Sequence, residues 1–267
     1  MQRRFVKMHG CGNDFAIFDE RKSPVALDSA SIKEMADRHR GIGFDQLVCL
    51  RTAADADVFM QIYNADGTEA GACGNATRCV ADILMRETGR ETAVVKTVSG
   101  HLPALRRTNG WIEVDMGSAS LRWDDIPLAR PMDTLHLDLP GDPAAASMGN
   151  PHITFLVDDM DHMDIPGIGP RFEHDELFPE RSNVGFAQVI DRSSMRLRVW
   201  ERGAGLTLAC GSGACAAVVN ASRRGVVDRR CRVIVDGGLL DICWRDDGHV
   251  TMSGATTMVY AGEISVP

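Results

Sequence analysis

The chain repeats its own motifs at a spacing of 137 residues. The segments "GACGNATRCVA" (71–81) and "LACGSGACAAV" (208–218) both place Ala-Cys-Gly and a small polar residue before a run of helical character, and 137 residues separate Cys73 from Cys210. The same spacing relates six further pairs: Asn13–Asn150, Gln46–Asn183, Asn64–Glu201, Asn75–Ser212, Gly100–Gly237 and Gly117–Gly254. One fixed, ungapped spacing over so many positions indicates an internal duplication.

Two long copies indicate two similar domains, since a solenoid needs several shorter repeats. We expect one half over 1–117 and the other over 118–254, the second opening with a connector that carries four prolines. The tail 255–267 alternates in apolar character and is expected to pack back on the first half as a strand. The predicted fold class is α+β: two pseudo-symmetric domains from an internal duplication, each a curved, mainly antiparallel sheet or barrel around a central helix.

Composition excludes several classes of partner. A hydrophobic content of 44% with 25% charged residues is that of an ordinary globular protein, and the net charge of −8 argues against nucleic-acid binding. No apolar run is long enough for a secretory signal or a membrane helix. We therefore expect a cytoplasmic protein with a small-molecule substrate, neither a nucleic acid nor a membrane as partner, and eight cysteines that are free thiols.

Each repeated cysteine directly precedes a predicted helix, with Asn75 and Ser212 as the expected N-cap residues. The backbone N–H groups at a helix N-terminus bind carboxylates and lower the pKa of a neighbouring thiol. Two such helix ends facing one cleft would hold a carboxylate with a thiol on each side of its α-carbon. This arrangement suits racemisation or epimerisation by two bases, in which Cys73 and Cys210 exchange the roles of thiolate and thiol.

Other interpretations are weaker. The remaining six cysteines are expected to be small buried residues. The spacings Cys73–Cys79 and Cys210–Cys215 do not match zinc ligands, and "GSGACA" matches a dinucleotide pattern that its counterpart "GNATRC" lacks. None of the four lysines has a recognisable pyridoxal phosphate context, so we expect no metal and no cofactor. Two rivals stay open: a racemase of a cyclic imino acid such as proline, and a non-catalytic amino-acid-binding or thiol redox protein.

The motifs "MHGCGNDF", "GFDQ", "NADG", "ACGNATRC", "MGNPH", "FPERSNVGF", "ERGAG" and "ACGSGACA" resemble those of the diaminopimelate epimerase family, in this order and over the whole chain. The resemblance implies a cofactor-independent isomerase that interconverts LL- and meso-diaminopimelate, on the route to lysine and to peptidoglycan. It also implies two similar domains that close over the substrate, and a homodimer.

Carried over position by position, the resemblance makes Cys73 and Cys210 the catalytic thiols, with His152 and Glu201 supporting the reacting centre. It assigns substrate-binding roles to Asn13, Gln46, Asn64, Gly74, Asn75, Asn150, Asn183, Glu201, Arg202, Gly211 and Ser212, and a dimer contact to Tyr260. These roles suit the side chains, because Arg202 can bind a distal carboxylate through two N–H groups and Glu201 can accept a hydrogen bond from an ammonium group. Three residues depart from the family's frequent choices: Leu206 replaces an acidic residue, Ser212 a threonine and Ala76 a glycine.

Overall fold

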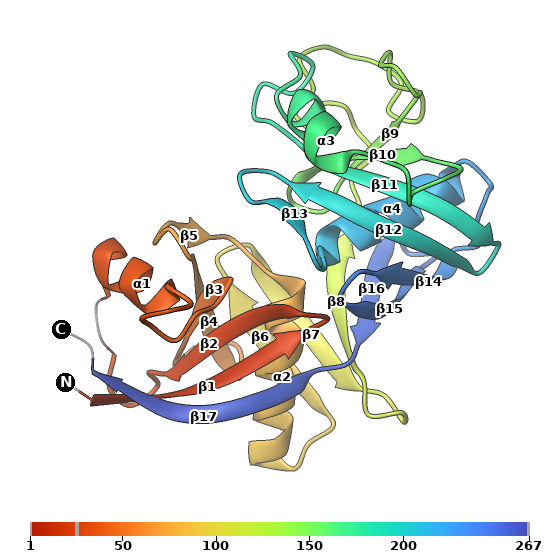
Figure 1. The fold of residues 1–267 in the computed structure, drawn as a ribbon. Coiled ribbons are helices and arrows are strands. Elements are labelled where there is room, and N and C mark those ends of the chain that lie inside the picture. The colour runs from red at the N-terminus through yellow and green to blue at the C-terminus, as the bar shows by residue number, and fades with distance from the viewer. Residues whose placement is uncertain (1, 25–26, 266–267) are drawn as a thin grey trace. The chain divides into compact units, whose positions relative to one another are not determined.

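The computed structural model describes all residues except 1, 25–26 and 266–267. The chain forms two compact units, one made of Met1–Val114 with Gly254–Pro267 and the other of Asp115–Ser253. Both are sheets with few helices, and each carries one long helix, labelled α2 and α4 in Figure 1. The α+β class predicted from the sequence is confirmed.

The first unit is a mainly antiparallel sheet with two helices. Its elements are β1 (Gln2–Gly10), β2 (Asn13–Asp19), α1 (Ser29–Ala36), β3 (Gln46–Arg51), β4 (Val58–Asn64), β5 (Glu69–Ala70), α2 (Gly74–Thr88), β6 (Thr92–Thr97), β7 (Gly100–Arg106), β8 (Ile112–Ser118) and β17 (Thr257–Ser265). Strand pairing runs β17–β1–β2–β3–β4–β6–β7–β8, and only β2–β3 and β4–β6 are parallel. Among the described strands this order gives an open sheet rather than a barrel.

The second unit repeats this order. Its elements are β9 (Ala144–Ser147), β10 (Pro151–Leu156), α3 (Ile165–Glu173), β11 (Asn183–Asp191), β12 (Ser194–Glu201), β13 (Gly205–Thr207), α4 (Gly211–Arg223), β14 (Arg230–Val235), β15 (Gly238–Trp244) and β16 (His249–Gly254). The pairs β10–β11 and β12–β14 are parallel, whereas β9–β10, β11–β12 and β14–β15 are antiparallel. Every element from β1 to β8 therefore has a counterpart from β9 to β16.

The register confirms the duplication in detail and corrects one part of it. Phe15 pairs with Gln46, and the residues 137 positions later, His152 and Asn183, also pair. After the long helix the spacing becomes 138, because the connection that follows α4 is longer than the one that follows α2. Gly100, with φ 124°, opens β7 just as Gly238, with φ 149°, opens β15. The sequence pairings of Gly100 with Gly237 and of Gly117 with Gly254 are thus wrong by one residue.

The long helices are the buried centres of their units. Helix α4 contacts β9, β10, β11, β12, β14 and β15, and nearly all of its residues from Gly213 to Ala221 are buried, as its small apolar sequence predicts. Helix α2 contacts β1, β6 and β7 and ends at Gly89, whose φ of 69° is the left-handed C-cap conformation that glycine adopts without strain. Both helices are thereby packed against the strands of their own units.

Two shorter helices, α1 and α3, are not predicted from the sequence. Asp28 caps α1 by accepting a hydrogen bond from the backbone N–H of Ser31 at 2.7 Å, and α1 buries Ile32 and Met35 against the first core. Helix α3 contains two prolines and two glycines, a composition that argues against a helix, yet Asp164 caps it and it packs on the second core. Tertiary packing overrides weak propensity here.

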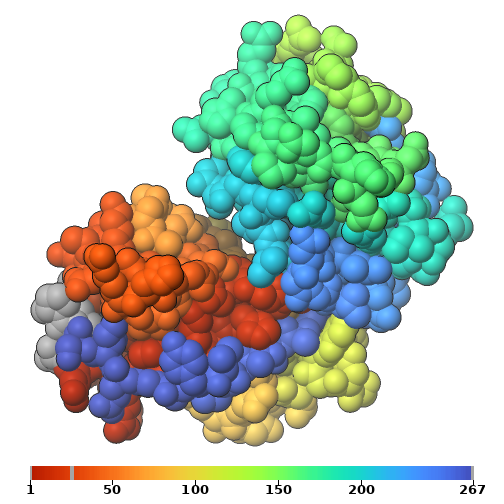
Figure 2. All heavy atoms as spheres, in the orientation of Figure 1, coloured from red at the N-terminus to blue at the C-terminus, as the bar shows by residue number. Residues whose placement is uncertain are grey.

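Strand β17 pairs antiparallel with β1 and leaves apolar side chains in solvent. Figure 2 shows its blue spheres on the surface of the first unit beside the red spheres of β1. Met258, Val259 and Tyr260 are each between 44% and 55% exposed. In the described part of the chain, no helix is long and apolar enough to span a membrane.

Candidate active site

Both repeated cysteines occupy the N-cap of their helix. Cys73 precedes α2 with extended backbone (φ −149°, ψ 111°), and Cys210 precedes α4 with φ −109° and ψ 109°. Asn75 and Ser212, expected to be the caps, are instead the second residue of each helix. Neither N-cap side chain makes a capping hydrogen bond, so the first N–H groups of α2 and α4, which directly follow the thiols in the chain, offer a binding place for an anion.

In the first unit, Asn13 lies against the start of α2. Residues Cys11 and Gly12, both with positive φ (54° and 80°), form the two-residue turn between β1 and β2, and Asn13 follows it directly. The Asn13 Oδ1 accepts from Asn75 Nδ2 at 3.1 Å and lies 3.7 Å from the Cys73 sulfur. The structure thus brings together three residues that the sequence predicted as one group.

Gln46 and Asn64 form a second polar pair in this unit. They are directly opposite each other in the antiparallel β3–β4 ladder, and Gln46 Nε2 donates to Asn64 Oδ1 at 3.0 Å. Asn64 Nδ2 in turn donates to the Thr68 hydroxyl at 3.1 Å. Strand register therefore explains why a glutamine in "GFDQ" and an asparagine in "NADG" lie side by side.

In the second unit, Cys210 is buried and its thiol is held in the protonated form. Burial raises the pKa of Cys210 well above its usual range, and the neighbouring Glu201 carboxylate raises it further. Hydrogen bonds from the Gly213 backbone N–H and from Ser212 act in the opposite direction. Cys73 is half-buried, so the two thiols have different surroundings despite their equivalent positions.

Buried His152 and half-buried Asn150 and Ser212 form a cluster beside Cys210. His152 Nε2 lies 3.0 Å from Asn150 Oδ1 and 3.0 Å from the Ser212 hydroxyl, and that hydroxyl lies 3.7 Å from the Cys210 sulfur. Burial, together with the positive charge of Arg202, lowers the pKa of His152 to about 3. At neutral pH His152 is therefore uncharged and acts as a hydrogen-bonding group rather than as a cation.

The Asn183 side chain is hydrogen-bonded to the backbone of Arg202. Asn183 Oδ1 accepts from the Arg202 backbone N–H at 3.0 Å, and Asn183 Nδ2 donates to the Pro151 carbonyl at 2.9 Å. The exposed Arg202 guanidinium donates to the Glu180 carbonyl at 2.9 Å. The Asn183 side chain, predicted to bind substrate, thus also fixes the turn that carries Arg202.

Comparison with known proteins identifies the family of this chain. The family model of diaminopimelate epimerase matches residues 5–122 and 144–259. The chain belongs to the diaminopimelate epimerase family. A diaminopimelate epimerase of Acidiphilium cryptum is 55% identical over 266 residues, covering 98% of this chain and 96% of the relative. One from Gluconobacter oxydans is 53% identical over 264 residues, covering 98% and 99%. As a member of this family, the protein is an isomerase.

Solved structures of lower identity share the fold. A phenazine biosynthesis protein of the PhzF family from Bacillus anthracis superposes with a TM-score of 0.71 at 15% identity over 100% of both chains. A hydroxyproline epimerase from Agrobacterium vitis gives 0.67 at 14% identity, covering 98% of this chain and 91% of that one. At such identities the likeness shows the architecture alone.

The sequence motifs do not predict the part that Thr207 plays at the site. Thr207 donates its hydroxyl to Glu201 Oε1 from the neighbouring strand β13, and Leu206 beside it packs on the second core. The carboxylate of Glu201 is thereby held by the hydroxyl of Thr207. Thr207 directly follows Leu206, the position at which the resemblance implies a frequent acidic residue. The hairpin register alone does not predict this contact, because it places Gly205 opposite Glu201 and Thr207 opposite Val199.

Proposed function

We propose that this protein interconverts LL- and meso-diaminopimelate without a cofactor, with Cys73 and Cys210 as the two acid–base groups. The observation that supports this most strongly is that both thiols occupy the N-cap of equivalent helices in two copies of one fold. Residues 1–117 with the strand of 255–267, and residues 118–254, would each supply one thiol. The two half-sites would then act on one substrate from opposite faces of its α-carbon.

In this mechanism the backbone N–H groups at Gly74–Asn75 and at Gly211–Ser212 hold the α-carboxylate. Removal of the α-proton places negative charge on that carboxylate, and fixed N–H dipoles stabilise such charge in the transition state. One thiolate takes the proton and the opposite thiol delivers another to the other face. The α-carbon inverts because the two protons are exchanged on opposite sides.

Glu201 has two effects on the second thiol. Without substrate, its negative charge raises the pKa of Cys210 and keeps the thiol protonated. An amino-acid ammonium bound to Glu201 would compensate that charge and so ease ionisation of the thiol. The neutral His152, bonded to Asn150 and Ser212, would keep the start of α4 in the geometry that holds the carboxylate.

The distal end of diaminopimelate is itself an amino acid and requires donors and acceptors together. Asn64 and Asn183 offer both from one amide, and Arg202 can bind a carboxylate through two N–H groups. Gln46 and Asn13 would complete the lining. This polar set favours diaminopimelate over proline, because a cyclic imino acid has no distal amino-acid end.

We also propose a cytoplasmic homodimer in which β17 forms the contact. Tyr260 is 44% exposed, and its ring packs edge-on against Phe5 with centroids 5.8 Å apart. Met258 and Val259 beside it are also exposed. A second copy would remove this apolar strand from water, which is a favourable change of free energy.

Single cysteine variants test the proposed function. We expect Cys73→Ser and Cys210→Ser each to lower the epimerisation rate by at least about 100-fold, because a serine hydroxyl is a far weaker acid than a thiol. Circular dichroism and thermal melting should stay close to those of the wild type. The matched control is Cys243→Ser, a half-buried thiol on β15 that should retain normal rates. Near-normal turnover in either N-cap variant would refute the two-base mechanism.

A further inference from the structure

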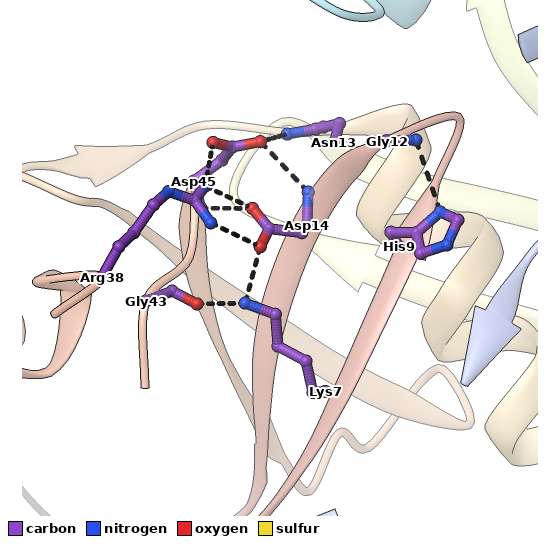
Figure 3. Close-up of polar contacts among 8 residues, drawn as sticks. All are labelled: Lys7, His9, Gly12, Asn13, Asp14, Arg38, Gly43 and Asp45. Atoms are coloured by element: carbon purple, nitrogen blue, oxygen red, sulfur yellow. Dashed lines mark hydrogen bonds and ion pairs between the residues drawn. The ribbon is translucent and has the colours of Figure 1, made fainter. Parts of the chain in front are cut away.

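Asp45 directly precedes β3 and lies beside Asn13, the first residue of β2. Strands β2 and β3 are parallel, so their starting residues meet at the same edge of the sheet. Asn13 Nδ2 donates to Asp45 Oδ2 at 2.9 Å, and the Asp14 backbone N–H donates to the same oxygen at 3.1 Å. Figure 3 shows the Asp45 carboxylate turned toward both donors.

This contact fixes which way the Asn13 amide points. An ionised carboxylate only accepts hydrogen bonds, so it selects the NH₂ group of the amide and leaves the oxygen on the opposite side. That oxygen is the atom that accepts from Asn75 Nδ2 and lies 3.7 Å from the Cys73 sulfur. A rotated amide would instead place its N–H donors against those of Asn75.

Asp45 is itself held by a cation. Arg38 Nη2 donates to Asp45 Oδ1 at 2.9 Å, and the Arg38 guanidinium also grips Asp14 with two bonds of 3.0 and 2.8 Å. Buried Lys7 pairs with Asp14 at 2.6 Å and donates to the Gly43 carbonyl. Burial raises the pKa of Asp14, but the hydrogen bonds from Arg38 and Lys7 outweigh it and bring that pKa to about 2.

The second unit orients its asparagine differently. The residue equivalent to Asp45 is Ser182, whose hydroxyl bonds to the carbonyl of Asn183 at 3.1 Å. There the neutral His152 has Nε2 3.0 Å from Asn150 Oδ1, and Asn150 Nδ2 donates to the Ser212 hydroxyl at 3.4 Å. Asn13 therefore turns its amide oxygen toward α2, whereas Asn150 turns its amide nitrogen toward α4. Of the two equivalent residues Asp45 and Ser182, only Asp45 has a carboxylate.

We propose that Asp45, held by Arg38, is a positioning residue that keeps the Asn13 amide oxygen directed at Cys73 and Asn75. An acceptor beside the sulfur favours the S–H form, whereas N–H donors in its place would favour the thiolate. Loss of the Asp45 carboxylate frees the amide to rotate and makes Cys73 more nucleophilic. The consequence for catalysis rests on the proposed function, whereas the consequence for the thiol does not.

The test compares alkylation of each cysteine by iodoacetamide at pH 7.5, measured by mass spectrometry. In Asp45→Asn we expect Cys73 to react several-fold faster than in the wild type, because the thiolate is the reacting form. Cys210 and the buried Cys79 should react at wild-type rates, which excludes general loosening. The matched control is Asp55→Asn, which removes an exposed carboxylate paired with Lys96 and should change none of the rates.

A double-mutant cycle measures whether Asp45 acts through Asn13. We expect Asp45→Asn to lower kcat/KM about tenfold in the wild type and to add nothing in Asn13→Ala, since residues acting through one contact are not additive. Asp45→Glu, which keeps an acceptor-only carboxylate, should recover much of the loss. Should Asp45→Asn fail to fold, Arg38→Gln provides the same alkylation readout with the same expected direction.

Two results would overturn the proposal. One is that Cys73 in the folded Asp45 or Arg38 variant is alkylated at the wild-type rate. The other is an equal loss of kcat/KM from Asp45→Asn with and without the Asn13 side chain. Because alkylation requires no turnover, it decides the positioning role even if the wild-type protein fails to epimerise diaminopimelate.

Discussion

The buried carboxylate of Glu173 provides a quantitative test of how α3 supports the turn that carries Glu201 and Arg202. Glu173 is the last residue of α3 and is only 3% exposed. One of its oxygens accepts from the Trp200 indole N–H at 2.7 Å, and the other from the Gly203 backbone N–H at 2.9 Å. These two bonds flank the turn on both sides.

The expected cost follows from the number of donors left without an acceptor. A buried donor that loses its partner costs about 1–3 kcal/mol; since Trp200 is half-buried and Gly203 is exposed to water, Glu173→Ala should lower the free energy of unfolding by about 1–3 kcal/mol. Glu173→Gln keeps one acceptor oxygen and turns an NH₂ group against the other donor. It should cost roughly half as much, about 0.5–1.5 kcal/mol.

Urea denaturation followed by circular dichroism gives these free energies, and hydrogen–deuterium exchange at the Gly203 amide reports the local effect. Exchange at Gly203 should accelerate in both variants. The matched control is Glu176→Ala, an exposed carboxylate three residues further along the chain, which should stay within about 0.5 kcal/mol of the wild type. A cost below about 1 kcal/mol for Glu173→Ala, with unchanged exchange at Gly203, would refute the reasoning.

Three further predictions concern other parts of the molecule. Because the pKa of His152 is about 3 in the folded protein and near 6.5 when unfolded, its contribution to stability is complete above pH 6.5 and is lost as the pH falls toward 3. Between pH 7 and 5 the wild type should lose about 2 kcal/mol more than His152→Gln in urea denaturation, and equal losses would contradict this. Gly43→Ala should cost more than Gly89→Ala by about 1 kcal/mol or more, since both have positive φ but only the added Cβ at Gly43 lies 2.9 Å from Arg38 Cα. Tyr260→Asp should shift sedimentation velocity from dimer to monomer, and an unchanged profile would reject β17 as the contact.

Much of the fold can be predicted from the sequence because the two copies of the duplication can be compared with each other. Each polar or glycine residue that recurs at a fixed spacing predicts an equivalent place in two copies, and the strand registers of Gln46 and Asn183 agree with this. The spacing alone does not reveal the lengthened connection after α4, since a surface loop tolerates an insertion at little cost in free energy. The pairings after that point therefore shifted by one residue.

The missed features depend on contacts that no local pattern contains. The N-caps are the cysteines and not Asn75 and Ser212, because the chain turns from extended to helical one residue after each thiol. Glu173 and Thr207 act on Glu201 and its turn from other elements, brought there by tertiary packing. Asp45 stood in a recognised motif, "GFDQ", but its role becomes visible only when the parallel pairing of β2 and β3 places it against Asn13.

The most direct test of the two-thiol mechanism is proton NMR of the reduced protein with LL-diaminopimelate in D₂O. Exchange on opposite faces predicts that the α-proton signal of the substrate falls only as meso-diaminopimelate appears, with deuterium already at the new centre in the first turnover. Proline and lysine should show no exchange, because each lacks the distal amino-acid end. Absence of any exchange with LL-diaminopimelate under reducing conditions would contradict the mechanism, as would an α-proton retained at the inverted centre of the meso product.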